Sequence, residues 1–240
     1  MSKEESPDKD KISELFKDPK FITFVRKVLP ELFNQLQIDF MDGNKVNPAV
    51  GIPRQKLLTA MFEVNEEGSI KEDAEMDGQK DVHLYDKPVS IKAVTCTGKG
   101  NTRSIPAGSI KLSWGGNAES ETKKKQRESF NPQYGMIIAS YAPDFDGTNH
   151  SGKWTVGLIY VPQHVVVAVF KKLKVKGFVK KGTKGDGRGD SITNKALTAL
   201  HDHADTAKIE INWKMPESWD PKSDLDFWKH KIRKLCDEEE

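Results

Sequence analysis

The stretch Asp81-Val-His-Leu-Tyr-Asp-Lys-Pro-Val-Ser-Ile-Lys92 predicts a β-hairpin. A carboxylate opens one short strand, Asp86-Lys87-Pro88 forms the turn, and the second strand carries Ser90 and Lys92. Side chains two residues apart in a strand point to the same face, so Ser90 and Lys92 project together, and the turn can bring Asp81 beside them. An acid, a hydroxyl and a lysine on one sheet face are the elements of a site for Mg²⁺ and phosphate.

The chain of 240 residues is long enough for one sizeable α/β domain. We expect a single domain over residues 1–240, in which residues 1–53 form a helical part available for a dimer contact and residues 54–240 form the core. No stretch approaches the ~18 apolar residues of a membrane span, and the charged N-terminus has no apolar signal-peptide core. Two cysteines, Cys96 and Cys236, make no disulfide framework and no metal spacing, so a reducing cytoplasm is expected.

Charge is unevenly distributed along the chain. The net charge of +2 does not by itself indicate a nucleic-acid partner. Basic residues, however, crowd two segments while acids collect in the C-terminal tail, which fits a protein with a basic cleft and an acidic exterior. A solvated, lysine-rich surface is the alternative for either segment. The basic residues are Lys171, Lys172, Lys174, Lys176, Lys180, Lys181, Lys184 and Arg188 in one segment and Lys123, Lys124, Lys125 and Arg127 in the other.

The hydrophobic pattern predicts a mixture of helices and strands. Near-continuous apolar runs late in the chain indicate strands that are covered on both faces. The predicted helices are Lys11–Leu36 (kinked or divided at Pro30), Arg54–Val64, a helix capped by Ser191 and running to about Ala204, and Ser223–Cys236. Besides the hairpin, the predicted strands are Ser109–Trp114, Tyr134–Tyr141, Lys153–Tyr160, His164–Phe170 and Ile209–Trp213, and Glu66–Gln79 is a connection or an edge strand.

The hairpin also carries a resemblance to a known family. Asp81…Ser90-Ile-Lys92 resembles the catalytic signature of the PD-(D/E)XK nucleases. Ile91-Lys-Ala-Val-Thr95, followed by Ile110-Lys-Leu-Ser-Trp-Gly-Gly116, is similar to the EcoRV branch of the type II restriction endonucleases. Apolar strands, a late glycine-rich loop and a closing helix with Asp224-Leu-Asp-Phe-Trp-Lys229 follow in the same order. The resemblance covers residues Lys80 to Lys234.

This resemblance implies a fold, an activity and a setting. The fold is a restriction-endonuclease-like α/β core, a mixed and mostly antiparallel central sheet flanked by helices. The activity is Mg²⁺-dependent hydrolysis of both strands of a short palindromic double-stranded DNA site by a two-fold homodimer, in a prokaryotic cytoplasm and within a restriction-modification system. Asp81 would bind the metal, Lys92 would orient the attacking water or stabilise the transition state, and Ser90 would hold a water of the metal site.

The sequence departs from the family pattern at two positions. Ser90 stands where Asp or Glu is usual, and Lys80 precedes Asp81 where the family often has Pro. EcoRV-type enzymes hold a glutamate on an early helix facing the site, so we expect Glu63 to be the second catalytic and metal-binding carboxylate, in preference to Glu119. A less efficient site with a single carboxylate is the alternative. The structural alternative is that Asp81 caps a strand, Ser90 and Lys92 are surface side chains, and Glu63 is a solvated helix end.

The glycine-rich segment Lys180–Asp190 is the expected DNA-reading loop, since glycines let a backbone approach base edges. Lys184 or Arg188 can bond guanine, while Asp186 or Asp190 can accept from cytosine. A flexible hairpin loop is the alternative.

Three further polar positions are expected to contact DNA. Asn194, at the start of the following helix, can address adenine or a phosphate. Asn117 belongs to a smaller loop near the minor groove, in which Lys123 and Lys124 would contact phosphates. A solvated surface is the alternative for each of these lysines.

Two other functions remain open on the residues alone. One is a structure-selective DNA repair or recombination nuclease of the same fold, and the other is a non-catalytic DNA-binding or partner-binding α/β protein, which Ser90 keeps open. His201 and His203, two apart on a predicted helix, do not share a face and are not expected to hold zinc. Cys96 is expected to be a structural thiol.

Overall fold

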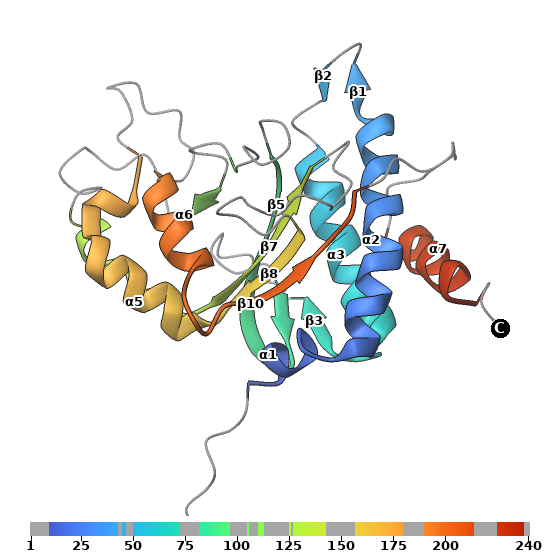
Figure 1. Ribbon diagram of the computed structural model, residues 1–240, viewed down its shortest axis with the longest axis horizontal. Helices are drawn as coiled ribbons and strands as arrows, with labels where there is room; N and C mark the ends of the chain where they lie inside the picture. The colour runs from blue at the N-terminus through green and yellow to red at the C-terminus, as the bar shows by residue number, and fades with distance from the viewer. Residues whose placement is uncertain are drawn as a thin grey trace, which may run out of the picture.

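The computed structural model describes residues 10–42, 45–46, 50–72, 82–96, 105, 110–112, 125, 127–142, 157–179, 190–213 and 225–237. Its centre is a six-stranded sheet in the order β10-β8-β7-β5-β4-β3 (Figure 1). The strands are β3 (Ile70–Glu72), β4 (Val82–Leu84), β5 (Lys87–Thr95), β7 (Gly135–Tyr141), β8 (Gly157–Val161) and β10 (Ala207–Glu210).

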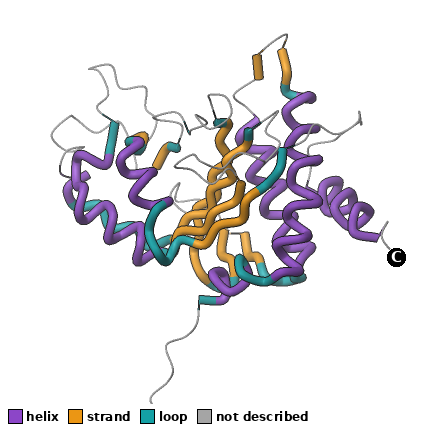
Figure 2. The backbone as a smooth tube through the Cα atoms, in the orientation of Figure 1, coloured by secondary structure: helices purple, strands orange, loops and turns teal. Residues whose placement is uncertain are grey.

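Strand pairing gives the sheet a mixed character. β5 and β7 run parallel, and each other neighbouring pair in this sheet is antiparallel. Helices lie on both sides of it (Figure 2). The expected α/β architecture, a mostly antiparallel sheet flanked by helices, is therefore confirmed. The helices are α1 (Lys11–Leu15), α2 (Pro19–Asp39), α3 (Gly51–Asn65), α5 (Gln163–Leu173), α6 (Asn194–His201) and α7 (Leu225–Asp237), with a 3₁₀ turn η3 (Lys174–Gly177).

The two central strands explain the apolar runs of the sequence. Every residue of β7 and β8 is buried. Tyr141 and Tyr160 belong to one face, where their rings contact Phe33 of α2 and Phe16 next to α1. Alternate residues face the opposite side, where α5 packs against β7 and α6 against β8 (Figure 1). The sheet is therefore the middle layer of a three-layer structure.

The N-terminal helix divides at a different place from the one predicted. The break falls between Leu15 and Pro19, and α2 then continues through Pro30. Proline fits the first turn of a helix, and the Asp18 carboxylate accepts the amide of Lys20 at 2.8 Å, so helix α2 starts there. Pro30 is buried, and the packing of α2 on α3 holds the helix across it.

The predicted strand His164–Phe170 is wrong, because this segment forms helix α5. Its valines favour strands, yet the buried positions recur at helical spacing. Those positions are Val165, Val166, Val169, Phe170 and Leu173. Phe170 also stacks on Phe178 at 5.0 Å between ring centroids, so tertiary packing overrides the β-branched propensity.

Other elements differ from the prediction in their bounds. The cap of α6 is Thr193 rather than Ser191, since the Thr193 hydroxyl accepts the amide of Ala196 at 3.2 Å. The predicted strand Ser109–Trp114 is described only as β6 (Lys111–Leu112), outside the central sheet and paired with β9 (Asp190–Ser191). Two further short strands, β1 (Met41–Asp42) and β2 (Lys45–Val46), pair with each other. The connection Glu66–Gln79 does contain an edge strand, β3.

The N-terminal helices are built into the core. Phe21 of α2 stacks on Phe62 of α3 at 5.7 Å between ring centroids. Among the described residues, the large apolar side chain that is exposed is Ile52, at 64%. None of the helices in the described ranges is long and apolar enough to cross a membrane.

Gly157 is predicted to be intolerant of substitution. A Cβ at this position would lie 2.1 Å from the carbonyl oxygen of Ile209, so β10 would have to move away from β8. We expect Gly157→Ala to lower the free energy of unfolding by about 1–3 kcal/mol in urea denaturation, as overpacking does. Gly51→Ala is the control, because a Cβ there meets nothing within 4 Å. Equal stability of the two variants would contradict the prediction.

Candidate active site

The candidate site is built on the hairpin of β4 and β5. Tyr85 and Asp86 form its turn with φ angles of 51° and 62°. Two consecutive positive φ angles define a type I′ turn, which matches the twist of the flanking strands. The turn is therefore one residue earlier than Asp86–Pro88, and Lys87 and Pro88 already belong to β5. An ion pair of 2.6 Å between Lys71 of β3 and Asp86 lies at the same end of the sheet.

Ser90 and Lys92 lie next to each other on one face of β5. Ser90 pairs in register with Met136 and Lys92 with Ile138, both on the parallel strand β7. Ser90 is fully buried and Lys92 is half-buried. Their face is opposite to that of Thr95, whose register partner Tyr141 contacts α2, so both side chains point to the side of α5 and α6.

Asp81 lies outside the described residues. Val82, the residue after it, pairs with Val89, the residue before Ser90. The described part of the hairpin therefore ends beside the candidate pair.

Glu63 lies at the other end of β5. Its carboxylate accepts the backbone amides of Gly68 at 3.1 Å and Ile70 at 3.3 Å. Ile70 pairs with Leu84, the last residue before the hairpin turn. The structure does not bring Glu63 to Ser90 and Lys92, because its carboxylate orders the connection between α3 and β3.

Helix α3 reaches the candidate site through a different residue, Gln55. Its side-chain nitrogen donates to the carbonyl oxygen of Ile91 at 2.6 Å, and Ile91 lies between Ser90 and Lys92. The sequence offers no signal for this contact, because an isolated glutamine at the start of a helix belongs to no motif.

Arg54, beside Gln55, is a buried cation. Its guanidinium donates to Thr95 Oγ1 at 2.9 Å and to Gln37 Oε1 at 2.6 Å. It also lies 4.8 Å from the ring centroid of Tyr141 and 5.5 Å from that of Phe33. Desolvation lowers the pKa of Arg54 to about 10, so the side chain stays charged at neutral pH. Arg54 thus joins α2, α3 and the end of β5.

The chain matches a known protein family. The family model described as "Restriction endonuclease ThaI" matches residues 15–229. The chain belongs to the ThaI restriction endonuclease family. It is a type II restriction endonuclease, that is, a site-specific deoxyribonuclease.

The fold agrees with this family. A solved structure described as "Restriction endonuclease in complex with substrate DNA" superposes with a TM-score of 0.69 and 23% sequence identity, covering 95% of this chain and 100% of that chain. No curated protein matches the chain.

The expected DNA-contacting residues of this restriction endonuclease are only partly described. Lys184, Asp186, Arg188, Asn117, Lys123 and Lys124 lie outside the described residues. Asp190 starts β9 and pairs with Leu112 of β6, and Asn194 is exposed in the first turn of α6. Both ends of the glycine-rich segment are anchored, since Val179 donates its amide to the Ser191 carbonyl at 2.8 Å.

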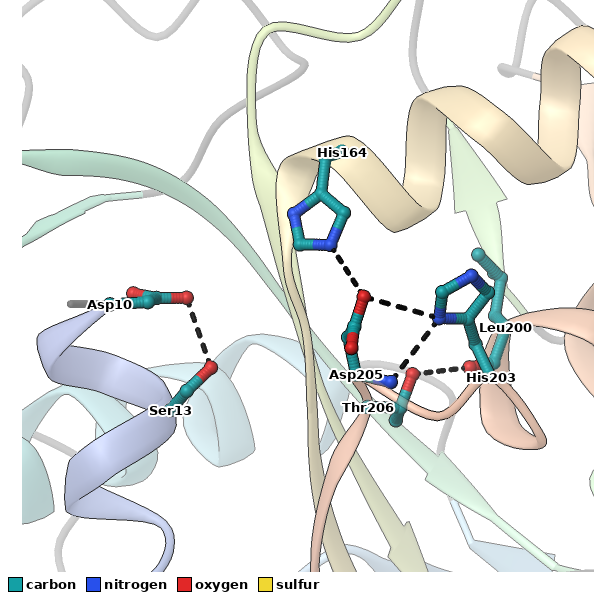
Figure 3. A network of polar contacts seen from close by, with 7 residues as sticks. All are labelled: Asp10, Ser13, His164, Leu200, His203, Asp205 and Thr206. Carbon is teal, nitrogen blue, oxygen red and sulfur yellow. Dashed lines mark hydrogen bonds and ion pairs between the residues drawn. The ribbon is translucent and has the colours of Figure 1, made fainter. Parts of the chain in front are cut away.

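The two histidines of the α6 region point to different partners. His201 is buried, and its Nδ1 lies 2.7 Å from the Asp202 carboxylate. His203 and His164 both face Asp205, at 3.8 Å and 2.9 Å (Figure 3). Within the described ranges, no three His, Cys, Asp or Glu side chains form a group that could hold a metal ion. The contact of Asp205 with His164 joins α5 to the loop before β10. Cys96 is buried, as a structural thiol would be.

His201 should make the stability of this enzyme depend on pH. Burial, opposed by the hydrogen bond to Asp202, lowers the pKa of His201, so the unfolded chain binds a proton more readily than the folded one. Stability should therefore fall as the pH drops below about 6.5, the ordinary value for histidine. We expect His201→Gln to flatten this fall in urea denaturation between about pH 7.5 and about pH 5. An unchanged pH dependence in the variant would contradict the assignment.

Proposed function

We propose that this restriction endonuclease uses Mg²⁺ to hydrolyse both strands of a short palindromic DNA site, with a PD-(D/E)XK-type site of the EcoRV kind on the β4–β5 hairpin. The observation that carries the proposal is the adjacency of Ser90 and Lys92 on β5, a partly buried strand in the middle of the sheet. A rigid strand is a suitable base for groups that must be held to a fraction of an ångström. Asp81, one residue before β4, supplies the carboxylate.

The residues fit Mg²⁺ in their chemistry. Mg²⁺ prefers oxygen ligands and usually retains several waters, so the carboxylate of Asp81 would suffice as a protein ligand, with the Ser90 hydroxyl holding one of those waters. The Glu63 oxygens are engaged by two backbone amides, and for this reason we assign Glu63 to the fold rather than to the metal. When bound, Mg²⁺ would neutralise phosphate charge and acidify a water.

The chain's own groups have distinct tasks in this proposal. The Lys92 ammonium stabilises negative charge that builds on the phosphate oxygens and orients the attacking water. The Ser90 hydroxyl holds a water next to Lys92, since both side chains project from the same face of β5.

Recognition of DNA is proposed on the same side of the sheet. Ser90 and Lys92 point toward the side of α5 and α6, and exposed Asn194 begins α6. Lys184, Asp186, Arg188 and Asp190 would read bases from the major groove. Asn117, Lys123 and Lys124 would position the duplex through its backbone.

A palindromic site implies a two-fold dimer, because protein symmetry then matches DNA symmetry. The apolar sides of α1 and α2 are already used inside the chain, so their polar sides remain for such a contact. A prokaryotic cytoplasm and a partner methyltransferase would complete the restriction-modification setting.

Lys92→Met tests the chemistry of the proposed site. Methionine keeps the length and apolar stem of lysine but removes the ammonium, so cleavage should fall by at least about 10³-fold with Mg²⁺ while binding of the same duplex is retained. Plasmid digestion gives the rate and gel-shift titration gives the Kd. Lys208→Met, on the edge strand β10, where the lysine side chain is exposed, is the control. Cleavage at the wild-type rate by Lys92→Met would overturn the assignment.

Digestion of mixed plasmid and phage DNA tests the metal and the type of target. We expect discrete fragments with Mg²⁺ and none with EDTA, and the sequenced ends would give the site and the stagger. A smear would instead favour a structure-selective nuclease. Trimming residues 182–189 should abolish site choice if this segment reads the bases.

Light scattering during size exclusion tests the assembly. With a duplex that carries its mapped recognition site, the enzyme should elute with the mass of two chains plus one duplex. A single chain on the duplex at micromolar concentration would contradict the dimer.

A further inference from the structure

Strand β5 lies between two neighbouring strands of the sheet, β7 and β4. On one side, β7 pairs with β5 from Val89 to Thr95. On the other side, described pairing with β4 ends at Val89.

The carbonyl of Ile91 points toward the edge of β5 that faces β4. Peptide groups of successive residues in a strand point alternately to its two sides. The amide of Cys96 donates to the Tyr141 carbonyl of the β7 strand at 2.7 Å, so even-numbered residues face β7. Ile91 is odd-numbered and therefore directs its carbonyl toward the β4 side.

Gln55 of α3 bonds this carbonyl. Its Nε2 lies 2.6 Å from Ile91 O. Gln55 is the fifth residue of α3, so this contact joins the start of the helix to the strand. A glutamine side chain presents the same N–H donor that a neighbouring strand would present. Gln55 thus ties the start of α3 to the edge of β5 that faces β4.

The same helix holds β5 at a second point. Arg54 donates to Thr95 Oγ1, four residues beyond Ile91, and its guanidinium is anchored by Gln37 of α2. Lys92 lies between these two points. The start of α3 therefore fixes the strand on both sides of the candidate lysine.

We propose that Gln55 is a positioning residue for DNA cleavage: by holding the backbone at Ile91, it sets the direction in which Ser90 and Lys92 project. This inference rests on the proposed function of Lys92. Ser90 and Lys92 share peptide bonds with Ile91, so a twist of that residue tilts both side chains. A misplacement of about 1 Å in a reacting group can cost about 10²-fold in rate.

The test compares cleavage with binding in Gln55→Met, which keeps the side-chain length and removes the donor. The substrate is a duplex carrying the site mapped by plasmid digestion. We expect the single-turnover cleavage rate to fall by about 10- to 100-fold. The Kd for the same duplex, measured with Ca²⁺ in place of Mg²⁺, should change by less than about twofold. An unchanged rate, or a rate loss that a weaker Kd accounts for, would overturn the proposal.

Thr59→Val is the matched control. Thr59 lies one turn after Gln55 on α3, and its hydroxyl donates to the carbonyl of Gln55, within the helix. Its loss affects the helix but not β5 directly. We expect both variants to show a comparable drop in Tm, but only Gln55→Met to lose cleavage rate. Equal rate losses would assign Gln55 to stability alone.

Gln55→Glu provides a pH readout that a purely structural role does not predict. An ionised carboxylate cannot donate to Ile91 O, whereas the protonated acid can. Partial burial beside a carbonyl favours the protonated form. The cleavage rate of Gln55→Glu relative to the wild type should therefore rise between about pH 8 and about pH 6, and a level ratio would contradict the proposal.

The Lys92→Met experiment separates the two failures. If Lys92→Met cleaves normally, the proposed active site is wrong and the Gln55 measurements lose their basis. If Lys92→Met is inactive while Gln55→Met is not, only the positioning role fails.

Discussion

The parallel pairing of β5 with β7 is the constraint on which the rest of the structure depends. It joins the hairpin strand to β7, a strand buried at every residue, over seven register pairs, from Val89–Gly135 to Thr95–Tyr141. This register decides that Ile91 and Thr95 face α2 and α3 while Ser90 and Lys92 face α5 and α6. A shift by one residue would bury the lysine against Arg54 and the aromatic rings around it. The two layers of helices bury the apolar residues that this pairing places on the two faces of the sheet.

Much of the fold was predictable because the patterns are local. The seven buried residues of β7 and the helical spacing of α3 and α7 need no tertiary information. The valine-rich segment of α5 is the instructive failure, since its strand propensity and its helical spacing disagree. The packing of Phe170 against Phe178 favours the helix. Local sequence cannot show this contact, because it joins α5 to a residue beyond its end. The hairpin turn was misplaced by one residue because Pro88 gave a stronger turn signal than Tyr85.

The candidate site shows the same division. Ser90 and Lys92 were predicted as neighbours because a period of two is a property of any strand. The sequence could not show which of Glu63 and Gln55 contacts β5, because this depends on the direction and rotation of α3 against the sheet. Glu63 has the negative charge of a Mg²⁺ ligand, but its position on α3 directs its carboxylate to the backbone amides of Gly68 and Ile70. Gln55 has no charge and directly contacts the strand.

The contrast between the two partners of β5 has a consequence for the order of folding. The β4–β5 hairpin closes over two residues and can form within microseconds, whereas the pair Ile91–Ile137 must close a loop of 46 positions in sequence. Until that loop closes, the segment Gly-Met-Ile-Ile-Ala-Ser-Tyr141 is not yet paired with β5. It contains no charged residue and no proline. Such a segment self-associates readily. The soluble yield of the enzyme should therefore depend on how soon β5 and β8 pair with this strand during folding.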